Sequence, residues 1–145
     1  EGVSDRQEIV REVDEITYVN DTSANAPDAM IAALRRFHGE KPADIVLIAG
    51  GVNKKLAFES LAEEIIKTCK AVVLLPGDAS DALARVLGTR ISVLRVETME
   101  DAVRVARRLA VRGDTVLLSP GASSTNIFRN EFERGERFRE EVRNV

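Results

Sequence analysis

The chain has 145 residues, the length of one ordinary domain, and its 44% of hydrophobic residues are enough to build one core. Its 21 basic and 24 acidic residues are interspersed and give a formal net charge of −3, so no one-signed surface is available for nucleic acid or an anionic membrane. One cysteine, Cys69, and the lack of an apolar run of membrane-spanning length are typical of a cytoplasmic protein with a reduced thiol. We expect a monomer and, because the chain begins at Glu1 without an initiator methionine, a piece of a longer polypeptide.

The order of the predicted elements indicates an α/β fold. Two strand-like runs, 8–13 and 16–19, flank Asp14 and Glu15 and predict an N-terminal β-hairpin. Short and almost continuously apolar runs then predict buried parallel strands at Ile45–Ala49, Ala71–Leu75, Ile91–Val96 and Thr115–Leu118. Apolar residues recur at helical spacing between these runs. The alternation predicts a Rossmann-like open, mostly parallel sheet flanked by helices on both faces.

Local signals place the ends of several helices. Ser60 and Thr98 each precede an acidic residue by three positions and predict capped helix starts. A charged helix is expected over 131–145. His38, the only histidine, follows a helix end and is expected to be a C-terminal cap. Cys69 is expected to be a buried structural thiol in the last turn of an apolar helix.

Three polar loops are the candidate functional segments. They lie at residues 20–25, 50–55 and 119–126. Because ligands of open α/β sheets bind outside the carboxyl ends of the strands, we expect the three loops to converge on one cleft.

Each loop also has a simpler structural interpretation. Gly50 and Gly51 are compatible with a tight strand-to-helix turn. Asp21 is compatible with an Asx turn, and the hydroxyl run 123–125 with an N-terminal cap for the last helix. From the residues alone, these alternatives stay open.

Familiar catalytic and phosphate-binding motifs are missing from the sequence. Neither G-x-G-x-x-G nor G-x-x-x-x-G-K-S/T occurs, so the sequence offers no recognisable cradle for nucleotide phosphates. A single histidine and a single cysteine also leave a catalytic triad or a zinc site without partners. We therefore expect no metal ligands and no catalytic residue in this chain.

Five segments, in order along the chain, resemble motifs of one family. Tyr18–Ala24 resembles N-D-S-K-A-T-N, Ile48–Lys54 resembles I-x-G-G-x-x-K, Thr98–Ala102 resembles T-M-E-x-A, Leu117–Ser124 resembles L-L-S-P-A-x-A-S, and Phe128–Phe138 resembles F-K-N-F-x-x-R-G-x-x-F. These are motifs of the C-terminal domain of the Mur ligases, and in particular of the member that adds D-glutamate to UDP-N-acetylmuramoyl-L-alanine. The resemblance covers nearly the whole chain.

The resemblance implies part of an ATP-dependent amide-bond ligase of peptidoglycan precursor synthesis. In that family ATP phosphorylates the carboxylate of the UDP-sugar substrate, and the amine of D-glutamate attacks the acyl phosphate. ATP and Mg²⁺ are bound mainly by a central domain, which follows an N-terminal UDP-binding domain. The C-terminal domain binds the amino acid and closes over the nucleotide. The resemblance therefore implies that residues 1–145 are inactive without the other two domains.

The same resemblance assigns roles to individual residues. Lys54 would pair with a carboxylate of D-glutamate, and Ser124 would donate a hydrogen bond to it. The other candidate substrate-binding residues are Asn25, Thr125 and Phe132. Arg6 and Asp21, fifteen positions apart as in the family, would face the ATP.

The chain departs from the family pattern in two places. Ser23, Asn25 and Ala26 stand where the family usually has lysine, threonine and asparagine; Asn25 still donates a hydrogen bond, whereas Ser23 does not replace a cation. The second phenylalanine of the last motif aligns with Glu131, and a slipped helix entry would let Phe132 cover the amino acid instead.

Two alternative functions remain. One is a stand-alone Rossmann-like binding module that uses the same cleft without chemistry. The other is a related ligase domain that adds a different amino acid, such as glutamate to folate. A G-T-x-G-K-S/T segment upstream of Glu1 would favour a ligase over a binding module.

Overall fold

The computed structural model describes residues 3–52, 57–124 and 127–145, which form a six-stranded sheet and five helices. The strands are β1 (Glu8–Val13), β2 (Ile16–Asn20), β3 (Ile45–Ala49), β4 (Cys69–Leu74), β5 (Ser92–Arg95) and β6 (Thr115–Leu118). The helices are α1 (Pro27–Phe37), α2 (Glu59–Thr68), α3 (Asp78–Leu87), α4 (Met99–Leu109) and α5 (Glu131–Arg143).

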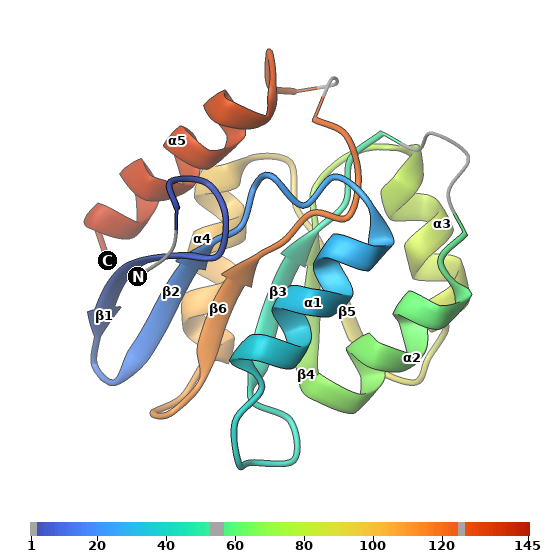
Figure 1. The fold of residues 1–145 in the computed structure, drawn as a ribbon, viewed down its shortest axis with the longest axis horizontal. Coiled ribbons are helices and arrows are strands. Elements are labelled where there is room, and N and C mark those ends of the chain that lie inside the picture. The colour runs from blue at the N-terminus through green and yellow to red at the C-terminus, as the bar shows by residue number, and fades with distance from the viewer. Residues whose placement is uncertain (1–2, 53–56, 125–126) are drawn as a thin grey trace.

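The sheet has the strand order β1-β2-β6-β3-β4-β5 (Figure 1). β1 pairs antiparallel with β2, and every later pairing is parallel. Because β6 returns to lie between β2 and β3, strands that are far apart in sequence share their carboxyl ends. The predicted open, mostly parallel sheet with an N-terminal hairpin is confirmed.

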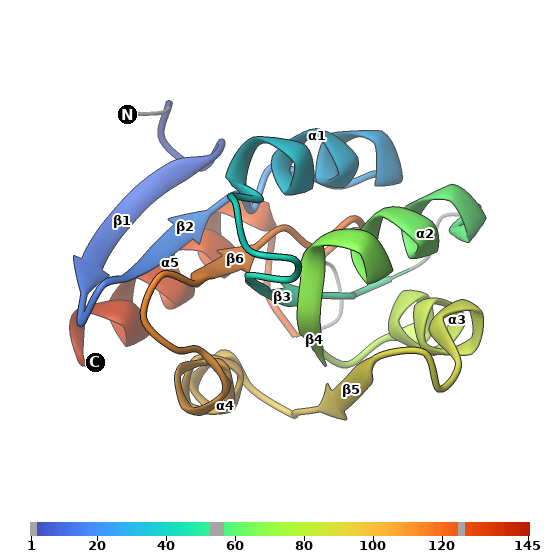
Figure 2. The same cartoon turned by 90° about the horizontal axis from the view of Figure 1, so that it is seen from below.

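Helices cover both faces of the sheet (Figure 2). On the central strand β3, Ile45, Leu47 and Ala49 pack with α1, α2 and α3, whereas Val46 and Ile48 pack with α4 and α5. This alternation follows from the two-residue period of a strand. The apolar runs therefore supply two core layers, as a sheet buried on both faces requires.

The hairpin turn has the conformation that its local sequence predicts, whereas the burial of the outer strand β5 depends on its place in the sheet. Asp14 and Glu15 both have positive φ, 56° and 61°, the conformation of a tight two-residue hairpin turn. The expectation that Ile91–Val96 is a fully buried strand is wrong, because β5 is the edge strand and its residues are only partly buried or exposed.

The predicted starts of α4 and of the charged last helix α5 are confirmed, and the predicted cap of α2 is wrong. Thr98 caps α4 by accepting a hydrogen bond from the N–H of Asp101. The Ser60 cap is wrong, since α2 begins one residue earlier, after the buried Phe58. Asn130, not the hydroxyl run 123–125, caps α5.

His38 lies at the end of α1, and Cys69 lies at the start of β4. The N–H of His38 bonds the carbonyl of Leu34 at the end of α1, and its Nδ1 lies 2.8 Å from Oδ1 of Asp44. Cys69 follows the last residue of α2 as the first residue of β4, not in the helix as expected. Burial raises the pKa of its thiol to about 12, which supports a structural rather than a reactive cysteine.

Candidate functional site

The three polar loops meet at one edge of the sheet. β2, β6 and β3 are neighbouring parallel strands, so their carboxyl ends lie side by side (Figure 1). Backbone hydrogen bonds tie the loops together: the N–H of Gly121 donates to the carbonyl of Ala24 over 2.7 Å, and that of Gly50 donates to Pro120 over 3.0 Å. The predicted convergence is confirmed for residues 20–25, 50–52 and 119–124; residues 53–55 and 125–126 of the predicted loops lie outside the described residues.

This edge is also where the chain changes face. After β3 the chain continues into α2 on one side of the sheet, and after β6 it continues to α5 on the other side (Figure 2). Such a switch point is the usual ligand position in open α/β sheets. Residues 50–52 and 119–124 lie at it and are hydrogen-bonded to each other.

The two glycines after β3 allow the loops to approach each other. Gly50 and Gly51 have φ of 102° and 147°, values that side chains disfavour. A Cβ on Gly51 would lie 2.1 Å from the carbonyl oxygen of Ser123. Val52 and Ser123 then form a two-way backbone bridge. The glycines therefore make a tight turn and also bring the backbone of one loop against another.

Asp21 links the first loop to the third loop and to the N-terminal segment. Its Oδ2 accepts from Oγ of Ser119 at 2.8 Å, and its Oδ1 accepts from the N–H of Gln7 at 3.0 Å. The Asx-turn interpretation is wrong, because the N–H of Ser23 donates to the carbonyl of Asp5 instead. Burial raises the pKa of Asp21, and the two hydrogen bonds oppose that shift.

Arg6 and Asp21 border the same hollow. It has a volume of about 240 Å³ and is completed by Gln7, Ser23 and Ala24 together with the start of α1. Arg6 is exposed, and its charge favours the ionised form of Asp21. The two candidate nucleotide-binding residues are thus brought together.

Arg134 is a central site residue that the analysis of single residues did not select. Its side chain is buried and donates to Oγ1 and O of Thr22, to Oδ1 of Asn25 and to the carbonyl of Ala122. It thereby joins the first and third loops from α5. Burial lowers its pKa to about 10, so it is still charged at neutral pH. The R-G pair of the last motif was the signal for it.

Asn25, one of the candidate substrate-binding residues, forms an unexpected pair. Nδ2 of Asn25 donates to Oε1 of Glu131 over 2.6 Å. Ser124 is buried at the third loop. Phe132 is 62% exposed and borders a different hollow, beside Ser4 and α5. The geometry therefore places Glu131, and not Phe132, next to Asn25.

Two candidate residues, Lys54 and Thr125, lie outside the residues that the structure describes. Within the described ranges, no group of three or more histidine, cysteine or acidic side chains is arranged to hold a metal ion. No helix in these ranges is long and apolar enough to cross a membrane.

Comparison with known families gives the affiliation. The family described as "Mur ligase, glutamate ligase domain" matches residues 5–122. The chain belongs to this family. The Mur ligase domain is 52% identical over 142 residues to a UDP-N-acetylmuramoylalanine–D-glutamate ligase of Roseiflexus sp. (strain RS-1), with 95% of the chain and 30% of the relative covered. The ligase of the same name from Pseudomonas aeruginosa is 39% identical over 141 residues, covering 97% of the chain and 31% of the relative.

Solved structures share the fold of this Mur ligase domain. E. coli FolC in complex with ADP has a TM-score of 0.68 at 18% identity, covering 99% of the chain and 33% of FolC. MurC, the UDP-N-acetylmuramate-alanine ligase of Thermotoga maritima, has a TM-score of 0.66 at 18% identity, covering 99% of the chain and 31% of MurC. The chain therefore corresponds to one part of these longer proteins.

Proposed function

We propose that this chain is the C-terminal domain of an ATP-dependent ligase that joins D-glutamate to UDP-N-acetylmuramoyl-L-alanine in peptidoglycan precursor synthesis. The observation that carries the proposal is the 52% identity to a ligase of that name over 95% of the chain. A UDP-binding domain and a central ATPase domain precede it in the proposed enzyme, which acts as a cytoplasmic monomer.

The described residues suit a contact with part of a nucleotide. The hollow of about 240 Å³ at Arg6 and Asp21 has room for one ring of a nucleotide, with a cation and a carboxylate at its border. No metal-binding cluster accompanies it among the described residues. When bound, ATP with Mg²⁺ would activate the substrate carboxylate at the central domain. Arg6 and Asp21 would orient the nucleotide from this side.

The second and third loops at this edge of the sheet supply the proposed amino-acid site. Lys54 follows the Gly50-Gly51 turn and would pair with a carboxylate of D-glutamate, while Ser124 would donate a hydrogen bond. Thr125 extends the same loop. Arg134 holds this loop and the first loop in register, so the amine is presented in one orientation.

A related ligase that adds another amino acid is the second candidate. The Asn25–Glu131 pair favours it, because the Glu131 carboxylate beside the first loop repels an amino acid that has two carboxylates. ADP release by the full-length protein, measured with UDP-N-acetylmuramoyl-L-alanine and each of several amino acids, tests both candidates. D-Glutamate should support the fastest release; faster release with another amino acid overturns the first proposal, and no release with any amino acid overturns both.

A further inference from the structure

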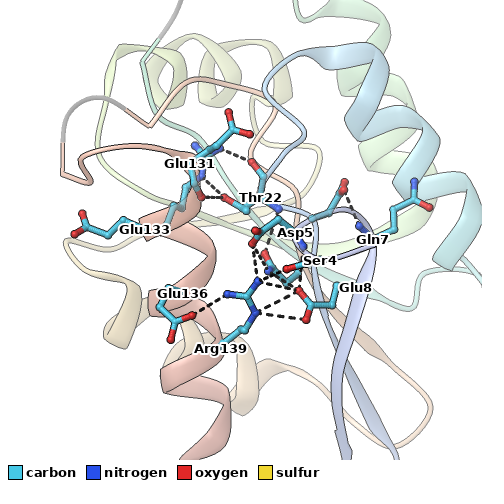
Figure 3. A network of polar contacts seen from close by, with 12 residues as sticks. Ser4, Asp5, Gln7, Glu8, Thr22, Glu131, Glu133, Glu136 and Arg139 are labelled. Atoms are coloured by element: carbon cyan, nitrogen blue, oxygen red, sulfur yellow. Dashed lines mark hydrogen bonds and ion pairs between the residues drawn. The ribbon is translucent and has the colours of Figure 1, made fainter. Parts of the chain in front are cut away.

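An ion-pair network joins the two ends of the chain. Arg139 of α5 contacts Asp5 through Nη2 at 2.8 Å and Glu8 through Nε at 3.3 Å (Figure 3). It also donates to Oγ of Ser4 and pairs with Glu136. The side chains of Arg139 and Asp5 are each only 15% exposed, so their charges are screened less than those of a surface pair.

The network holds an unusual backbone conformation around Arg6. Asp5 and Gln7, its two neighbours, have positive φ of 68° and 48°, a conformation that is uncommon for non-glycine residues. Hydrogen bonds hold this conformation on both sides. Nδ2 of Asn20 donates to Oδ1 of Asp5, and the N–H of Gln7 donates to Asp21.

The helix α5 is shaped to receive this segment. Gly135 lies one turn before Arg139, and a Cβ on it would lie 2.5 Å from Oδ1 of Asp5 and 2.6 Å from Cγ2 of Thr22. Glycine is costly inside a helix, but here it removes a clash with two segments that pack on α5. Burial disfavours the charge of Glu8, yet hydrogen bonds from Asp5, Arg139 and Asn20 lower its pKa overall, so it stays an ionised partner.

The geometry points to Arg139 as a positioning residue for the nucleotide contact: through Asp5 and Glu8 it fixes residues 4–7 and so sets where Arg6 enters the hollow beside Asp21. The inference rests on the proposed function. Arg139 touches no candidate ligand position itself. Its effect should therefore depend on the presence of the Arg6 side chain.

The test is a double-mutant cycle in the full-length protein. Arg139→Gln should raise the KM for ATP about five- to tenfold, with kcat and the KM for D-glutamate changed less than about twofold. In an Arg6→Ala background, Arg139→Gln should add nothing, because both changes remove the same contact. Arg137→Gln is the matched control, since Arg137 lies on the same helix and pairs with Glu140 in an exposed ion pair. An unchanged KM for ATP in Arg139→Gln, or an undiminished effect without Arg6, overturns the inference.

A second measurement separates this inference from the proposed function. Trypsin cleaves after arginine, and a segment held by the network should resist cleavage after Arg6. Arg139→Gln should accelerate that cleavage at least about threefold, as followed by mass spectrometry, and Arg137→Gln should not. Equal cleavage of the Arg139→Gln variant and the unsubstituted protein refutes the positioning role. Absence of ligation by the unsubstituted protein refutes the proposed function and leaves the cleavage result to decide on the network.

Discussion

Replacing Arg134 by methionine should destabilise the domain because the guanidinium joins three segments from inside. Four hydrogen bonds from a charged donor contribute about 1.5 kcal/mol each. Against them stands the cost of burying the charge, about 3 kcal/mol from the lowering of its pKa to about 10. Methionine has a similar length but leaves the acceptors on Thr22, Asn25 and Ala122 unpaired. We expect a net loss of about 3 kcal/mol in the free energy of unfolding.

Thermal unfolding of the 145-residue chain, followed by circular dichroism, measures this loss. A domain of this size should unfold about 6–12 °C lower after Arg134→Met. Arg129→Met is the control, since the side chain of Arg129 is 85% exposed and pairs with Glu133 four residues later in α5. Its effect should stay below about 0.5 kcal/mol. If the two variants unfold at the same temperature, the reasoning that Arg134 joins the loops is refuted.

Three further predictions concern the ligand site, the isolated chain and pH. Lys54→Ala in the full-length protein should raise the KM for D-glutamate roughly ten- to a hundredfold, whereas the neighbouring Lys55→Ala should change it much less; equal effects would contradict the motif alignment. The isolated chain should hydrolyse no ATP above a heat-killed control, and calorimetry should detect no micromolar ATP binding, because a few contacts without a phosphate loop do not offset the cost of association. Burial opposes the ionisation of Asp114, but Lys41 and Lys70 lower its pKa overall. The stability that the Asp114 charge contributes is therefore complete at neutral pH. It is lost as the pH falls from the ordinary aspartate pKa through the lower pKa of the folded state. Asp114→Asn should therefore be less stable than the unsubstituted protein at pH 7 and lose less stability on acidification below about pH 4, as measured by urea titrations at neutral and acidic pH. Equal stability of the two proteins at both pH values would contradict a contribution from the ion pairs.

Much of the fold could be predicted because its signals are local. A run such as Ile45–Ala49 has no polar position, and that property alone indicates a strand buried on both faces. The start of α4 at Thr98 was predictable for the same reason, since a capping hydroxyl acts within three residues. Signals that compete with packing were less reliable. Ser60 has the right residue type for a cap, but Phe58 is buried at the helix start and the helix begins before the serine.

The candidate site was predictable only in outline. The loops at 20–25 and 119–126 were selected because parallel strands place their carboxyl ends at one edge of the sheet. The strand order, in which β2, β6 and β3 are neighbours, confirms that these carboxyl ends share one edge. Which side chains face one another there depends on contacts across more than a hundred residues. Arg134 bonds Thr22, and Glu131 bonds Asn25, and neither contact leaves a periodic trace in the sequence.

The sequence by itself determined the family, the α/β class and the position of the strands, because motif order, residue type and apolar period are properties of short segments. The tertiary structure alone decided that α5 holds the N-terminal segment through Arg139 and that Glu131 rather than Phe132 lies beside Asn25. Both depend on the angle and rotation at which α5 packs on the sheet. That packing is set by buried residues such as Phe138 and by the close approach that Gly135 permits; both residues belong to the last motif, but the motif does not give their contacts.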